Sequence, residues 1–181
     1  MALKKNILAL IGSASENSSN LKLVKLFAKL TSTDFNVAIF DNLKKLPHFN
    51  PSLSAENTPK IVLDFRNKIQ TADGLLICTP EYVFSIPSGL KNAIEWCVST
   101  VVFSHKPVGL ITASAEGQKG HEELKLIMKT VETIFTEQTT LLIRGIKGKM
   151  DANGTITDTK TDKDFRNFID SYKNLIKDIR C

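Results

Sequence analysis

The sequence contains few cysteines and no long hydrophobic run, and each absence narrows the classes of protein to which it can belong. Three of the 181 residues are cysteines, and they form no CxxC pair, so neither a disulfide framework nor a zinc ribbon is expected. No apolar stretch approaches the roughly 18 residues of a membrane helix. The run Ile7–Ile11, after Met1–Lys5, is shorter than the roughly 7–15 residues of an export signal. We therefore expect a cytoplasmic protein with reduced thiols and no membrane partner.

A strong excess of charge is also lacking. The 24 basic and 19 acidic residues give a formal net charge of +5, and the basic residues are interleaved with acidic ones. A nucleic-acid-binding domain would need a basic patch, so we expect no nucleic-acid partner, whereas a mild positive charge fits attraction of anionic small molecules. Length and ordinary globular composition indicate a single domain over residues 1–181.

Five short apolar runs along the chain are typical of β-strands. They are continuous and do not alternate with polar residues, as in strands that are covered on both faces. The predicted strands are Ile7–Ile11, Val37–Phe40, Leu75–Cys78, Val108–Ile111 and Leu141–Ile143.

Patterns with helical spacing lie between these runs, because apolar residues recur there at intervals of three and four. The second predicted helix is expected to have Thr58 as its N-cap and Pro59 at its first position. Strands that alternate with helices imply parallel βαβ units and a doubly wound α/β sheet. The predicted helices are Leu23–Leu30, Ile61–Ile69, Leu90–Cys97, Leu124–Phe135 and Phe165–Ile179, and the predicted long polar loops are Asn42–Asn57 and Gly145–Lys160, with a turn at Asn153-Gly154 in the second.

Ligands of such sheets bind beyond the carboxyl ends of the strands, where three segments of this chain are unusual. The first segment, Gly12–Asn20, places hydroxyl, amide and backbone N–H groups at the start of a helix. This composition predicts a phosphate site, although ordinary helix capping by serine and asparagine would leave the same pattern. It contains neither a Walker loop nor a GxGxxG turn.

The other two segments have the composition of a site for a flat ring. The second segment, Thr79–Trp96, combines prolines with the aromatic residues Tyr82 and Phe84, which can stack on a heterocycle or simply pack beneath the loop. The third segment, Thr112–Gly120, is rich in small residues that permit a ligand to approach the backbone closely, or that form a flexible connection.

The second segment closely resembles the PEYNxSxPGxLKNAIDW signature of the NAD(P)H-dependent FMN reductases, a flavodoxin-like group that includes bacterial quinone, azo-dye and chromate reductases. The first segment resembles the GSxRxxSxN loop of the same family, with Gly12, Ser13, Ser18 and Asn20 at the matching positions. The resemblance runs over nearly the whole chain. It implies a flavodoxin-like three-layer sandwich with a five-stranded parallel sheet in the order 2-1-3-4-5.

The resemblance also implies one non-covalently bound FMN, and it indicates which residues would contact the phosphate and which the flavin ring. Ser13, Ser15, Ser18 and Asn20 would surround the phosphate. The flavin ring would be lined mainly by backbone groups and the face of Tyr82, and the positions that correspond are Pro80, Glu81, Tyr82, Val83, Ser114 and Gly117. The family is usually dimeric or tetrameric, so a homodimer or homotetramer is expected.

Three positions depart from the family pattern. Ser15 stands where the phosphate loop has arginine, which removes a charge-assisted contact to a dianion. Val83 replaces the family's asparagine, and Ser88 replaces a glycine, which matters only if that backbone needs a positive φ. The first two changes are expected to affect FMN affinity or the choice of acceptor.

The function implied is an FMN-dependent NAD(P)H oxidoreductase with a ping-pong cycle. NADPH or NADH passes hydride to bound FMN, and a quinone, azo, nitro or flavin acceptor then takes the electrons, so no catalytic side chain is required. The alternative is a non-enzymatic electron carrier or redox-sensing flavin protein. His48, His105 and His121 lack metal-ligand spacing, so no metal is expected. His121 is interpreted as a solvated residue at a helix start, with contact to substrate as the alternative because it lies near the third segment.

Overall fold

Five parallel strands form one sheet in the order β2-β1-β3-β4-β5, as expected. The computed structural model describes residues 3–40 and 42–178 of the chain. Each predicted apolar run lies within a strand, and the buried side chains of β3 and most of β4 explain why those runs are continuous. The strands are β1 (Lys5–Ile11), β2 (Phe35–Phe40), β3 (Gly74–Thr79), β4 (Val108–Ser114) and β5 (Thr140–Arg144).

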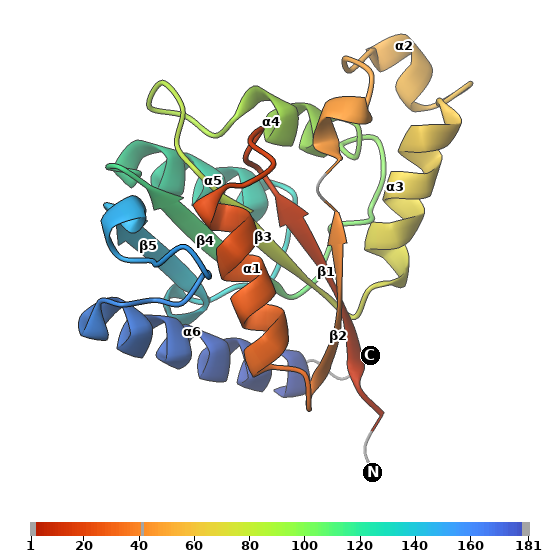
Figure 1. The fold of residues 1–181 in the computed structure, drawn as a ribbon. Coiled ribbons are helices and arrows are strands. Elements are labelled where there is room, and N and C mark those ends of the chain that lie inside the picture. Colours follow the sequence, from red (N-terminus) through yellow and green to blue (C-terminus); the bar gives the residue numbers. More distant parts are fainter. Residues whose placement is uncertain (1–2, 41, 179–181) are drawn as a thin grey trace.

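Helices cover both faces of this sheet (Figure 1). On one face, α1 and α6 pack over a core that contains Phe27, Phe165 and Tyr172. On the other face, α3, α4 and α5 enclose a second core around Phe65 and Trp96. The helices are α1 (Ser19–Leu30), α2 (Pro51–Ser54), α3 (Lys60–Thr71), α4 (Ser88–Glu95), α5 (Gln118–Thr130) and α6 (Thr159–Asp178), with 3₁₀ turns η1 (Leu43–Lys45), η2 (Glu137–Thr139) and η3 (Ile146–Gly148).

Helix α6 approaches the sheet closely at two glycines. Tyr172 of α6 is fully buried and its hydroxyl donates to the carbonyl oxygen of Leu75, at 2.8 Å. A Cβ atom at Gly109 of β4 would lie 2.8 Å from Cζ of Phe168, and one at Gly74 would lie 2.8 Å from the Tyr172 hydroxyl oxygen. Glycine is therefore required at both positions, because any side chain would push α6 off the sheet.

The expected cap of α3 is wrong. Pro59 occupies the N-cap position, and no side chain caps the helix. Thr58 is not available as a cap, because its Oγ1 donates to the carbonyl oxygens of Leu53, at 2.8 Å, and Ser54, at 3.2 Å. Thr58 instead closes the end of α2, inside a stretch that was expected to be a loop.

The predicted fourth helix is also too long. Helix α5 ends at Thr130, and Glu132 follows in a left-handed conformation with φ of +61°. The N–H of Thr133 then donates back to the carbonyl oxygen of Met128, at 3.1 Å, as in a Schellman termination. The residues Ile134 and Phe135 lie beyond this turn. At the other predicted helix end, Ile179 lies outside the described residues.

Both long loops contain short helical turns. The stretch 42–57 includes η1 and α2, and the stretch 145–160 includes η3. The turn predicted at Asn153-Gly154 is confirmed, since Gly154 has φ of +84° and Met150 and Ile156 form an antiparallel bridge around it.

Candidate functional site

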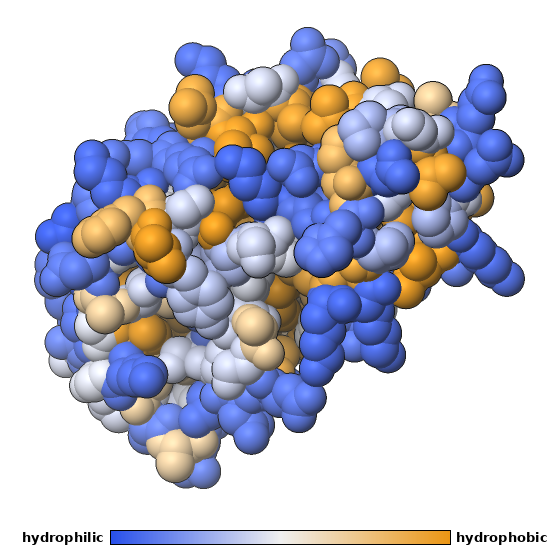
Figure 2. All heavy atoms as spheres, turned by 90° about the horizontal axis from the view of Figure 1, so that it is seen from above, coloured by the Kyte–Doolittle hydropathy of each residue, from blue (hydrophilic) through white to orange (hydrophobic). Residues whose placement is uncertain are grey.

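The three unusual segments meet at the carboxyl ends of β1, β3 and β4. β1 lies between β2 and β3, and the chain leaves β1 for α1 on one face but leaves β3 for α4 on the opposite face. This reversal is the point at which open α/β sheets bind their ligands. Figure 2 looks onto this end of the molecule, where apolar patches interrupt a mainly hydrophilic surface.

The first segment starts with a glycine that the packing requires. The N–H of Gly12 donates to the carbonyl oxygen of Cys78, at 2.9 Å. A Cβ atom at Gly12 would lie 2.2 Å from Oγ1 of Thr79, so only glycine lets the segment cross so close to β3.

Three backbone N–H groups of the first segment have no acceptor among the described residues. Among the residues that the structure describes, the N–H groups of Ala14, Glu16 and Asn17 make no hydrogen bond, whereas that of Ser15 donates to Oγ of Ser13, at 3.3 Å. Helix α1 follows directly and has no acidic residue in its first turn. Uncommitted donors at the start of a helix favour an anionic ligand, so this donor set fits a phosphate group.

The two remaining residues of the predicted phosphate site have structural partners. Ser18 is the N-cap of α1, and its Oγ accepts from the N–H of Leu21, at 3.1 Å. Asn20 is buried: its Nδ2 donates to the carbonyl oxygen of Ala113, at 3.2 Å, and its Oδ1 accepts from Sγ of Cys78, at 3.3 Å. The structure thus places Asn20 beneath the segment, where it joins α1 to β3 and β4, and not on the segment's surface.

Glu81 joins the second segment to the third. Its carboxylate accepts from the N–H of Gly117, at 3.3 Å, and of Gly120, at 2.7 Å, and its carbonyl oxygen accepts from Oγ of Ser114, at 3.4 Å. Gly117 has φ of +89° and is the N-cap of α5. Glu81 therefore fills the anion-binding start of α5 and holds the two segments together.

The tip of the second segment is a tight hairpin. Tyr82 and Ser85 exchange both backbone hydrogen bonds, at 2.9 and 3.1 Å. Val83 and Phe84 lie between them at φ of +51° and +58°, as in a type I′ turn, and both side chains are largely exposed. Tyr82 is half-exposed and lines the neighbouring cleft, and Pro80 directly precedes Glu81 at the end of β3.

A carboxylate that the sequence did not reveal supports this hairpin. Oε2 of Glu123 accepts from Oγ of Ser85, at 2.5 Å, and from the N–H of Ile86, at 3.1 Å, and Oε1 lies 3.2 Å from Nζ of Lys91. Burial alone would raise the pKa of Glu123, but these hydrogen bonds and the lysine charge hold it below its usual value. Glu123 thus stays ionised at neutral pH and fixes the base of the hairpin.

A cleft of about 310 Å³ opens between the first segment, η1 and the start of α4. Ser13 and Tyr82 line it, together with Lys44 and His48, which follow β2 and were not predicted as site residues. Their only signal in the sequence is that they lie in the loop after a strand that neighbours β1.

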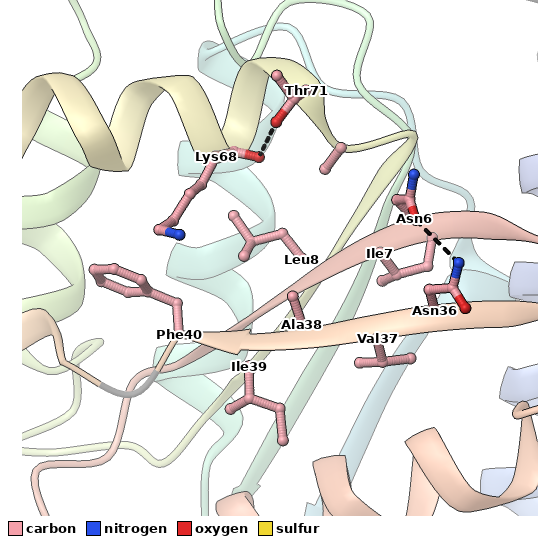
Figure 3. A pocket seen from close by; sticks show the side chains of 11 residues that line it. Asn6, Ile7, Leu8, Asn36, Val37, Ala38, Ile39, Phe40, Lys68 and Thr71 are labelled. Carbon is pink, nitrogen blue, oxygen red and sulfur yellow. Dashed lines mark hydrogen bonds between the residues drawn. The ribbon is translucent and has the colours of Figure 1, made fainter.

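A second hollow, of about 480 Å³, lies against the edge strand β2 (Figure 3). Leu8, Ala38 and Phe40 face it from β1 and β2, and Lys68 faces it from α3. It lies along the strands and receives no residue of the three segments. The cleft at the carboxyl ends is therefore the better candidate for a ligand site.

This chain matches the sequence profile of the NADPH-dependent FMN reductases over residues 5–146. It belongs to that family. A 2-hydroxy-1,4-benzoquinone reductase from a Burkholderia species is 32% identical over 187 residues, covering 99% of this chain and all of the relative. The quinone reductase of Escherichia coli K12 is 27% identical over 168 residues, covering 89% of each chain.

Solved structures agree with this family. FerB, a flavoenzyme NAD(P)H:(acceptor) oxidoreductase from Paracoccus denitrificans, superimposes with a TM-score of 0.83 at 27% identity and covers 96% of this chain and 98% of its own. An archaeal flavodoxin, at 9% identity and a TM-score of 0.61 over 94% and 98% of the two chains, shares the fold alone.

The structure explains why serine can replace the family's glycine at position 88. It gives no such reason for the departures at Val83 and Ser15. Ser88 begins α4 and is not among the described residues with positive φ, so the family's glycine is not needed there. Val83, by contrast, has a positive φ, which asparagine tolerates better than a β-branched residue. Ser15 is exposed and brings no charge to the first segment.

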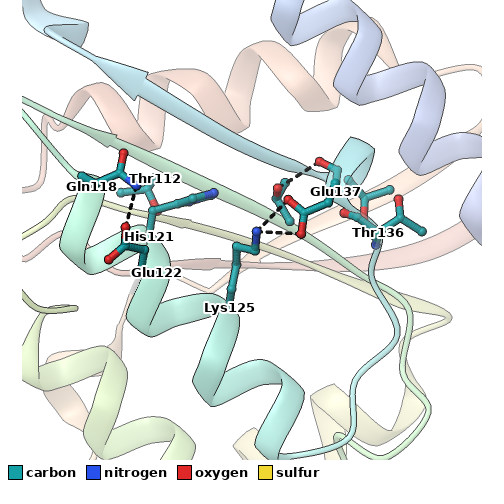
Figure 4. Close-up of polar contacts among 9 residues, drawn as sticks. Thr112, Gln118, His121, Glu122, Lys125, Thr136 and Glu137 are labelled. Carbon is teal, nitrogen blue, oxygen red and sulfur yellow. Dashed lines mark hydrogen bonds and ion pairs between the residues drawn. The ribbon is translucent and has the colours of Figure 1, made fainter.

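His121 is not the solvated residue that was expected of it. It is 8% exposed in the first part of α5, and Nδ1 lies 2.9 Å from Oγ1 of Thr112 (Figure 4). Burial first, and then the charge of Lys125, lower the pKa of His121, although Glu137 and Glu122 oppose this. A neutral imidazole that bonds to β4 is therefore part of the packing beneath the third segment.

Residues 3–40 and 42–178 contain neither a membrane-spanning helix nor a cluster of metal ligands. No helix in that part of the chain combines the length and apolarity needed to cross a bilayer. No group of three His, Cys, Asp or Glu side chains is placed there to hold a metal ion.

Proposed function

We propose that this protein is an FMN-dependent NAD(P)H oxidoreductase whose single FMN-binding domain spans residues 1–181. The observation that carries the proposal is the meeting of three segments at the switch point of the sheet, with uncommitted N–H donors beside a cleft that holds Tyr82. The reductase names of the relatives, of FerB and of the family support the same reaction class.

The first segment would bind the phosphate of FMN. The N–H groups of Ala14, Glu16 and Asn17 and the hydroxyls of Ser13, Ser15 and Ser18 supply donors, and α1 contributes the positive end of its dipole. Asn20 acts from below by holding this segment against β3 and β4.

The second and third segments would bind the flavin ring. The backbone of Pro80, Glu81 and Val83 and the face of Tyr82 line one side, while Ser114 and Gly117 approach from the third segment. Bound FMN would accept hydride from NADPH or NADH and pass the electrons to a quinone, azo, nitro or flavin acceptor. The side chains of this chain bind and orient the reactants, so none needs to act as a nucleophile.

We further propose a cytoplasmic homodimer or homotetramer. The exposed apolar side chains of Val98 and Val101, in the segment that follows α4, support a subunit contact there. The buried, unpaired thiols of Cys78 and Cys97 are consistent with a reducing compartment.

The visible spectrum of the purified protein, recorded as isolated and again after FMN addition and desalting, tests this function. A retained flavin spectrum that NADPH or NADH bleaches under nitrogen, and that a quinone restores, is the expected result. Retained flavin that neither nucleotide bleaches would contradict the enzyme and favour the electron carrier or redox sensor. A chain that retains no flavin would contradict the FMN site itself.

The variant Tyr82→Ala separates ring binding from folding. Because Tyr82 is 44% exposed, its removal should change the free energy of unfolding little but weaken FMN binding markedly. The control is Phe84→Ala, which removes an exposed aromatic side chain that does not line the cleft. Equal FMN affinities in the two variants would contradict the assignment of Tyr82.

A further inference from the structure

The first segment lacks the positive charge that a phosphate dianion calls for. Ser15 replaces the family's arginine, and none of the residues from Gly12 to Asn20 is basic. The segment instead carries Glu16, whose side chain is 85% exposed. The backbone donors and the α1 dipole would therefore attract the phosphate, while the carboxylate of Glu16 would repel it.

A lysine from a different part of the chain lies beside this segment. Lys44 belongs to η1, after β2, and its Nζ is 3.2 Å from Oε1 of Glu16. Of the described residues that line the 310 Å³ cleft, Lys44 is the one lysine or arginine, and Ser13 and Ala14 line the same cleft. Figure 1 shows residues 42–50, which lead into α2, at the same end of the sheet as the start of α1.

The anchoring of η1 leaves the lysine head free to move while its backbone stays in place. Leu43 and Leu46, on either side, are buried in the core that α4 covers. The Lys44 side chain itself is 61% exposed, and its ion pair with Glu16 is a surface pair. Such pairs contribute little to stability, so the ammonium can turn from Glu16 to a nearby phosphate at little cost.

We propose that Lys44 binds the phosphate of FMN and replaces the arginine that is missing at Ser15. This inference rests on the proposed function, since it assigns a residue to the same cofactor site. Lys44 neutralises Glu16 in the flavin-free protein and contacts the dianion when the cofactor is bound.

The test is the Kd of the flavin-free protein for FMN and for riboflavin, measured by flavin fluorescence. Riboflavin lacks the phosphate, so Lys44→Met should weaken FMN binding about ten-fold and leave riboflavin binding unchanged, because a lysine charge beside a dianion in water-like surroundings is worth about that factor. The matched control is Lys45→Met, which removes the neighbouring exposed lysine of η1 that does not line the cleft.

Two further variants test the charge balance itself. Glu16→Gln should tighten FMN binding several-fold, because it removes the competing carboxylate and releases Lys44. Adding Ser15→Arg to Lys44→Met should restore FMN affinity, since it returns the charge to the first segment.

The outcomes separate this inference from the proposed function. Wild-type protein that binds neither flavin would overturn both. Equal FMN affinities of the wild-type protein and Lys44→Met would overturn the role of Lys44 alone. An equal loss of FMN affinity in Lys45→Met would also overturn it, because the effect would then come from the overall positive charge of the protein. An equal loss of riboflavin affinity in Lys44→Met would overturn it too, because the effect would then come from a change in the loop structure.

Discussion

Replacing Val83 by asparagine should make this protein more stable. Val83 is a β-branched residue with φ of +51° at the tip of the second segment, and its side chain is 94% exposed. In the left-handed region the Cβ of an L-residue crowds the following carbonyl oxygen, and asparagine is among the residues that tolerate this region best. Asparagine is also the residue of the family pattern at this position.

The expected gain follows from the geometry. A non-glycine residue in the left-handed region costs roughly 1–2 kcal/mol, of which asparagine recovers part. The exposed valine side chain gives up almost no buried area when it is replaced, so no packing loss offsets this gain. Val83→Asn should therefore raise the free energy of unfolding by about 1 kcal/mol, which corresponds to about 2–4 °C in Tm for a chain of this size.

Urea unfolding of the flavin-free protein, followed by tryptophan fluorescence and by circular dichroism, measures this difference. Thr157→Asn is the matched control, because Thr157 is also β-branched and exposed but is not among the described residues with positive φ. The control should change stability by less than about 0.5 kcal/mol. The reasoning is refuted if Val83→Asn is no more stable than wild type, or if the control gains as much.

Three further predictions address the buried polar groups. Arg66→Met should lower the free energy of unfolding by about 2–3 kcal/mol, because it removes the guanidinium that donates to the carbonyl oxygen of Trp96 and one of the donors to that of Ser54; a loss below 1 kcal/mol in urea unfolding would contradict this. Since the pKa of His121 is below its usual 6.5, the unfolded chain binds the proton more readily and the folded state loses stability as pH falls below about 6.5. Between pH 7.5 and 5.5 the loss should reach at most about 1.4 kcal/mol, and His121→Gln should flatten it, whereas an unchanged slope would show that other groups are responsible. Burial raises the pKa of Cys97 to about 12, so iodoacetamide at pH 8 should modify it only after unfolding, as peptide mass spectrometry can determine.

The fold could be predicted from the sequence because its main signals are local. Each strand is a continuous apolar run, and each long helix has one apolar face. The errors occur where the decisive contact is not local. Helix α5 ends at Thr130, and the left-handed residue that follows is Glu132 and not the glycine that usually marks such an end. Thr58 donates its hydroxyl to carbonyl oxygens at the end of α2 and therefore does not cap α3.

The location of the candidate site could be predicted from the sequence, but the hydrogen bonds within it could not. The three segments are recognisable because each directly follows a buried strand. The bonds within the site join residues that are distant in sequence: Asn20 with Ala113, and Glu81 with Gly120. A short motif records that an asparagine or a glutamate is present, but the packing determines whether its side chain faces a ligand or a neighbouring segment.

The net charge around the proposed phosphate site is likewise not predictable from one motif, because a motif includes only the charged residues of its own segment. Parallel pairing of β1 with β2 places Leu10 opposite Phe40, so the segments that follow the two strands emerge side by side. Glu16 and Lys44 meet as a consequence, although they belong to different loops. If Lys44 contacts the phosphate as proposed, the loss of arginine at Ser15 weakens cofactor binding less than the first segment alone predicts. In that case the parallel sheet would allow a neighbouring loop to supply the positive charge that the first segment lacks.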